Sequence, residues 1–173
     1  MSKRKDFVYD KLEIKILILF ILRRLPEPIP LKALAELTLN SGGISYFDFM
    51  ECVSDLVKTE HLLIKDEKYS LTAKGQRNGR VTENSLPYFL KMDAENTTAV
   101  YRSEMNRNAM IKTTHTTNTD GNCSVSLSLS DGIGDIVSMN LFAINEKHAA
   151  ALENGFRKRA ESIYNEIIKS LIE

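Results

Sequence analysis

Apolar residues recur at helical spacing in three segments near the start of the chain. The first segment, residues 12–24, contains an uninterrupted apolar run from Ile16 to Leu22, which predicts a helix buried on nearly every side. Three prolines then end this helix and force an extended link. A second helix is predicted at residues 31–40. After a glycine-containing break, Ser45 is the expected N-cap of a third helix, Tyr46–Lys58.

The pattern changes after the third helix. Residues 61–72 predict two short strands joined by a charged turn, and a further short helical segment is expected to start near Ala73. Three helices followed by a hairpin is the element order of a winged helix-turn-helix domain, which we assign to residues 1–80. Residues 81–109 predict a connecting helix, with a strand at residues 97–102 as the alternative.

The second half of the chain predicts a different unit. Residues 110–119, 122–130 and 135–145 have the pattern of a three-stranded antiparallel meander, and the middle strand alternates apolar residues with serines. The amphipathic segment Glu146–Ile172 predicts a long helix that covers the apolar face of this sheet. The expected fold class is therefore α+β, with a winged helix-turn-helix followed by a small α+β domain at residues 110–173.

Charge and composition narrow the choice of partner only slightly. The formal net charge is zero, so no overall field attracts nucleic acid or anionic lipid. Residues 1–80 carry 14 Lys/Arg and 11 Asp/Glu, whereas residues 81–173 carry 9 and 12. A membrane span needs about 20 apolar residues, more than the apolar run offers. With no secretory signal pattern at its start, the chain is expected to be cytoplasmic and not to contact a membrane.

The residues that usually carry chemistry are scattered. His61, His115 and His148 lack metal-ligand spacing, and Cys52 and Cys123 are expected to be buried free thiols. His61 is expected to end the third helix, where a cation interacts favourably with the helix dipole. No nucleophile motif, phosphate loop or dinucleotide fingerprint is evident. We therefore expect no enzymatic activity, no metal and no cofactor.

Several segments resemble an uncharacterised bacterial family of winged-helix proteins that is known only as a domain of unknown function. The resemblance rests on residues 14–25, 45–50 (Ser-Tyr-Phe-Asp-Phe-Met), 71–75 (Leu-Thr-Ala-Lys-Gly), 149–156 and 160–164. The Leu-Thr-x-x-Gly ending of the hairpin is also similar to that of the PadR and MarR groups of regulators. The resemblance implies a winged-helix fold and a role in transcription, and it implies no substrate or ligand.

DNA recognition by the third helix is in tension with its charges. With Val53 at the centre of the buried face, helical geometry turns Asp48, Glu51, Asp55 and Lys58 outward, and carboxylates oppose phosphate binding. Binding of double-stranded DNA is then expected to depend on a basic N-terminal arm, on the hairpin and on the segment after it. The candidate DNA-binding residues are Lys3, Arg4, Lys5, Ser45, Lys58, Lys65, Lys68, Lys74, Arg77 and Arg80.

The last helix has a wide apolar stripe, which predicts a homodimer. The candidate dimer-interface residues are Phe156, Ile163, Tyr164, Ile168 and Ile172. Sensing of a small ligand, whose identity the sequence does not specify, and binding of another protein are alternative roles for this domain. The alternative function for the whole chain is a winged-helix protein–protein interaction module that does not bind DNA. In that case, the acidic face of the third helix and Phe47 contact a protein.

Overall fold

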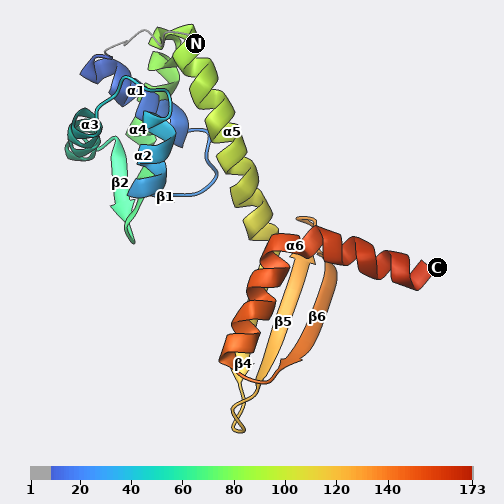
Figure 1. Ribbon diagram of the computed structural model, residues 1–173. Helices are drawn as coiled ribbons and strands as arrows, with labels where there is room; N and C mark the ends of the chain where they lie inside the picture. Colours follow the sequence, from blue (N-terminus) through green and yellow to red (C-terminus); the bar gives the residue numbers. More distant parts are fainter. Residues whose placement is uncertain (1–8, 173) are drawn as a thin grey trace. The chain divides into compact units, whose positions relative to one another are not determined.

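The computed structural model describes residues 9–172 and has an α+β fold with two small three-stranded antiparallel sheets. Contacts divide the chain into two compact units, one ending at Arg102 and the other beginning at Ser103 (Figure 1). This division falls inside helix α5 (Tyr88–Met110). The predicted connecting helix is thus confirmed, and the alternative of a strand at residues 97–102 is wrong because that segment is helical.

The first unit contains the three predicted helices, each within two residues of its expected bounds. Its further elements are the predicted hairpin, a fourth helix, a 3-10 turn and the first part of α5. The elements are α1 (Lys11–Leu22), β1 (Ile29–Pro30), α2 (Leu31–Leu39), α3 (Tyr46–Lys58), β2 (Leu62–Lys65), β3 (Lys68–Leu71), α4 (Ala73–Thr82) and η1 (Glu83–Ser85). The extended link after α1 provides a strand that the sequence did not predict, because Ile29 pairs with Tyr69 and gives the sheet order β1-β3-β2.

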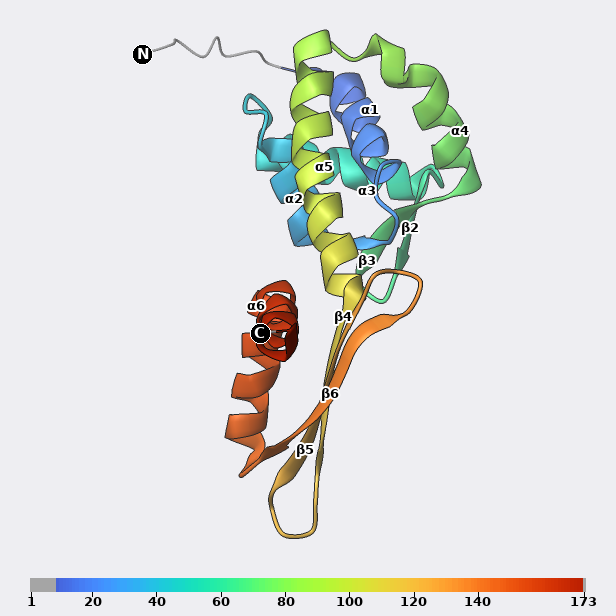
Figure 2. The ribbon, with the colours of Figure 1, turned by 90° about the vertical axis from the view of Figure 1, so that its right-hand side faces the viewer.

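Helix α1 is the centre of this unit. Every side chain from Ile16 to Leu22 is buried, as the apolar run predicted, and Figure 2 shows the helix enclosed by its neighbours. Asp10 and Glu13 form a capping box that fixes where it begins. Helix α4 packs closely on it, since a Cβ atom at Gly79 would lie 3.2 Å from the Cβ of Leu19. Within residues 9–172 no helix combines the length and apolar character needed to cross a membrane.

The second unit is a meander covered by one helix, as predicted. Strands β4 (Ile111–Thr117), β5 (Cys123–Ser130) and β6 (Asp135–Ala143) pair in the order β4-β5-β6, and α6 (Glu146–Ile172) follows. The apolar residues of β5 are buried beneath α6, whereas the serines at positions 124 and 126 are exposed on the opposite face. The two faces of this sheet therefore differ as the alternation indicated.

Helix α6 is not continuous, which corrects the expectation of a single helix lying along the sheet. Arg159 has non-helical backbone angles, with φ −133° and ψ 20°, and the helix changes direction there (Figure 1). Phe156 and Ala160 are buried against the sheet, but Leu171 is 77% exposed. The apolar stripe predicted to cover the sheet therefore does so only in its first part.

Candidate nucleic-acid interface

Helix α3 is held in one orientation by its cap and by its buried face. The hydroxyl of Ser45 accepts a hydrogen bond from the backbone N–H of Asp48 at 3.0 Å and donates one to its carboxylate at 2.6 Å. Phe49, Cys52 and Leu56 are buried against the rest of the unit. Ser45, a candidate DNA-binding residue, is therefore occupied in capping the helix.

Two acidic residues of α3 are paired with lysines of α1. The Lys11 ammonium lies 2.5 Å from a carboxylate oxygen of Glu51, and the Lys15 ammonium lies 2.8 Å from one of Asp55. The hydrogen bond from Lys15 lowers the pKa of Asp55 below its ordinary value. Two of the three acids expected to face outward are therefore paired with α1, and their side chains stay 40% and 38% exposed.

Other outward side chains of α3 are not acidic. Phe47, Ser54 and Lys58 are all exposed and recur at helical spacing, and we call them the outward stripe. Phe47 is 76% exposed, and Tyr46 beside it is exposed as well. The outward surface of α3 thus offers an aromatic ring, a hydroxyl and a cation, together with Glu51, whose charge is paired with Lys11.

The hairpin of β2 and β3 brings two of the candidate lysines together. Asp66 and Glu67 form its tight turn with positive φ values of 50° and 59°. Lys65 and Lys68 are direct cross-strand partners on either side of that turn, and both are exposed. The structure therefore places a pair of cations at the end of the hairpin, beside the two acids of the turn.

Lys74 and His61 have structural roles at the end of α3. The Lys74 ammonium donates to the backbone carbonyl of Thr59, the C-cap of α3, at 2.8 Å. The ring of His61 lies 2.8 Å from the Thr59 hydroxyl and 2.7 Å from the Asn78 amide. Burial, followed by the charge of Lys74, lowers the pKa of His61, so this ring is neutral at pH 7. The sequence had suggested His61 as the cation at this helix end. In the structure, Lys74 is the cation that contacts it.

An apolar depression of about 600 Å³ connects the end of α3 with the hairpin. Its lining includes Val57 and the side chains of Leu63 and Ile64, which are both exposed by more than two fifths. Sequence reasoning missed this surface because two adjacent apolar residues in a short strand normally indicate burial on both sides.

The other predicted site residues are distributed as follows. Arg77 and Arg80 are exposed on α4, whereas positions 3–5 lie outside the described residues. Among the dimer candidates, Phe156 belongs to the core of its own unit, and Ile163 and Tyr164 pack partly against that core. Ile168 and Ile172 are exposed. The described part of the chain has no group of His, Cys, Asp and Glu side chains that is arranged to hold a metal ion.

Comparisons with known proteins give a family but no characterised relative. No curated protein matches the chain, and neither does any solved structure. One family model matches residues 14–171, which span both units. The chain belongs to this family, which is described as a domain of unknown function, DUF4364.

Proposed function

We propose that this protein is a cytoplasmic DNA-binding transcriptional regulator and not an enzyme. In this proposal, the first unit is a winged helix-turn-helix domain, α3 is its recognition helix and the β2–β3 hairpin is its wing. The observation that carries the proposal is the outward stripe of α3, where Phe47, Ser54 and Lys58 are exposed while Glu51 and Asp55 are paired with lysines of α1.

The outward stripe has the chemistry that reading a major groove requires. An α-helix with its side chains is about 10–12 Å wide and fits the groove, which is about 12 Å wide. An aromatic ring such as that of Phe47 contacts the methyl group of thymine. A hydroxyl such as that of Ser54 bonds to base edges, and a lysine such as Lys58 bonds to guanine or to a phosphate. The paired acids reduce the repulsion that free carboxylates would exert on the DNA backbone.

The wing adds contacts to the phosphates. Lys65 and Lys68 face each other across the hairpin and are exposed, so both are accessible to a DNA strand beside the groove that α3 enters. Each neutralised phosphate contributes about −0.9 to the slope of log K against log salt. With Lys58 included, three such contacts contribute about −3 for each copy of the unit.

The test is a charge reversal with a matched control. We expect the wild-type chain to bind a fluorescent mixed-sequence DNA duplex at low salt, measured by anisotropy across a salt series. Changing Lys58, Lys65 and Lys68 to Glu is expected to lower the affinity at least about tenfold and to flatten the salt slope by about 3. Changing Lys147, Arg157 and Lys158 to Glu, which makes the same charge change on the second unit, leaves much more of the affinity. Equal losses in the two triple variants, or no binding by the wild type, would contradict the proposal.

One observation favours a second function, that of a protein–protein interaction module. Phe47, Leu63 and Ile64 expose apolar surface on α3 and on the hairpin. Exposed aromatic and aliphatic anchors of this kind are typical of protein interfaces. This second function would be favoured if the wild-type chain did not bind DNA and if Phe47→Ser abolished its binding to a protein partner.

A further inference from the structure

The second unit leaves part of its apolar sheet face uncovered. Met139 and Leu141 of β6 pair with Leu127 and Val125 of β5 and therefore point to the same side of the sheet. Val125 is fully buried, whereas Leu141 is 38% exposed. With Val137, which shares their face, these two β6 residues form what we call the β6 strip.

A groove runs along the β6 strip beside helix α6. It has a volume of about 180 Å³, and Met139 and Leu141 line it on the sheet side. Leu152, Phe156 and Ile163 of α6 line its other side. An apolar groove between a strand and a helix is a shape that accepts the apolar face of another helix.

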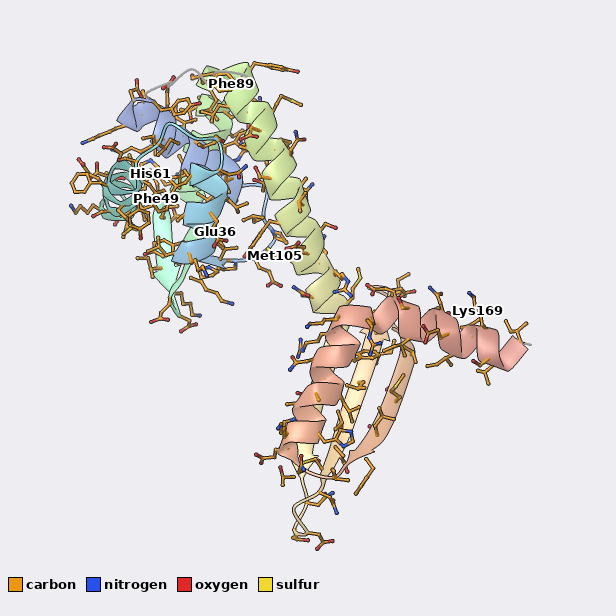
Figure 3. All side chains as sticks on the ribbon, in the orientation of Figure 1. Glu36, Phe49, His61, Phe89, Met105 and Lys169 are labelled. Carbon is orange, nitrogen blue, oxygen red and sulfur yellow. The ribbon has the colours of Figure 1, made fainter. Side chains whose placement is uncertain are left out.

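The same unit carries a helical segment whose apolar side chains are exposed. We call residues 165–172 of α6 the α6 tail; they follow the bend at Arg159 and the residues up to Tyr164 that still pack against the core, and Lys169 is labelled on the tail in Figure 3. Ile168, Leu171 and Ile172 lie at helical spacing on the tail and are all exposed. These three side chains form an apolar stripe that the described residues of the unit do not cover.

We propose that the α6 tail of one chain docks on the β6 strip of a second copy, and that the second copy returns the same contact. A two-fold dimer covers both the stripe and the strip of each chain at once, because an isologous interface uses the same surfaces twice. The exposure of Leu171 and Ile172 shows that the tail does not cover its own sheet. The dimer does not depend on DNA binding by the first unit.

The dimensions and the area suit this arrangement. Eight helical residues extend about 12 Å at 1.5 Å per residue, which fits within the about 30 Å that the nine residues of β6 extend. Covering the stripe and the strip removes on the order of 500 Å² of apolar surface from each chain. A standard interface buries about 800 Å² on each side, and its polar rim accounts for the difference.

The first experiment measures the oligomeric state by sedimentation and light scattering. We expect a dimer for the wild type, and folded monomers for Leu171→Glu/Ile172→Glu and for Leu141→Glu, with circular dichroism confirming the fold. Ile133→Glu is the matched control, because Ile133 is 97% exposed in the same unit and belongs to neither surface. A monomeric wild type, or a dimer that both the tail and the strip variants retain, would overturn the proposal.

The second experiment tests which surfaces meet. A chain with Leu141→Cys is mixed with a chain carrying Leu171→Cys under mild oxidation; the native Cys52 and Cys123 are buried and are present in both. We expect a disulfide between the two kinds of chain and much less from either variant alone. Efficient cross-linking of Leu171→Cys to itself would indicate that the tails pair with each other. A third sample is one chain that carries both Leu141→Cys and Leu171→Cys. If its disulfide forms only within single chains, the tail lies on its own sheet. Either result would overturn the proposal that each α6 tail docks on the β6 strip of the other chain.

Discussion

Two phenylalanines separated by one residue on α3 provide a direct test of how this helix is oriented. Phe49 is fully buried, whereas Phe47 is 76% exposed. A buried phenylalanine removes about 150–200 Å² from water, which at about 25 cal/mol per Å² is worth roughly 4–5 kcal/mol. Phe49→Ala is therefore expected to destabilise the first unit by about 3–5 kcal/mol, the range found for such truncations. Phe47→Ala removes the same atoms and is expected to change stability by no more than about 0.5 kcal/mol.

The assay must report on the first unit, because a chain with two units need not unfold in one step. Native-state hydrogen exchange of the α1 amides meets this need, since α1 is the centre of that unit and packs against α3. We expect Phe49→Ala to speed exchange of the most protected α1 amides by at least about a hundredfold, given about 1.4 kcal/mol per factor of ten. Phe47→Ala is expected to leave exchange nearly unchanged.

A binding measurement on the same two variants completes the test. Phe47→Ala is expected to weaken DNA binding while the fold is retained, because Phe47 lies in the outward stripe. If Phe47→Ala were to destabilise α1 as much as Phe49→Ala does, α3 could not be oriented with Phe47 outward and Phe49 inward. The recognition surface that depends on this orientation would then be wrong as well.

Two further predictions concern pH. Burial opposes ionisation of Glu83, but its hydrogen bond to Arg23 and the nearby charges lower its pKa below the ordinary 4.5. A carboxyl group with a lowered pKa stabilises the folded state above its ordinary pKa, and this stability is lost as pH falls through the pKa of the folded state. In Glu83→Gln, the free energy of unfolding is therefore expected to fall less steeply as the pH is lowered. Burial and the charge of Lys74 lower the pKa of His61, so an NMR titration of its ring is expected to give a pKa below the ordinary 6.5. The same pKa is expected to rise in Lys74→Gln. A His61 pKa that does not respond to this change would exclude the contribution of Lys74.

The periodicity of the sequence predicted where most elements lie, because burial of apolar residues determines that pattern. The helix Tyr46–Lys58 was predicted to the residue, and so was Glu146–Ile172. The strand β1 was not predicted, because two residues of an extended link carry no periodic signal and pair only through a distant hairpin. The bend at Arg159 was not predicted either, because the apolar spacing continues across it.

The candidate surface on α3 was harder to predict than the helix itself. Sequence reasoning centred the buried face on Val53. The structure buries Cys52 completely and exposes Tyr46, so the face is rotated toward the cysteine. A rotation of this size moves Asp55 from the outer face to the flank. Cysteine is among the most frequently buried residue types, and giving Cys52 more weight would have placed the face correctly.

The neutral net charge of the chain hides how its charges are used. The cations of α1 and of the two residues after it are paired with acids of neighbouring elements: Lys11 with Glu51, Lys15 with Asp55, Arg23 with Glu83, and Arg24 with Glu83 and Glu95. Such pairs use basic residues to hold neighbouring elements together, and they also offset the charges of the acids. The field that a DNA strand meets depends on the charges that remain at the surface and on their positions. Lys58, Lys65 and Lys68 remain exposed, with Asp66 and Glu67 beside the hairpin lysines, so a chain of zero net charge still places exposed cations on α3 and on the hairpin.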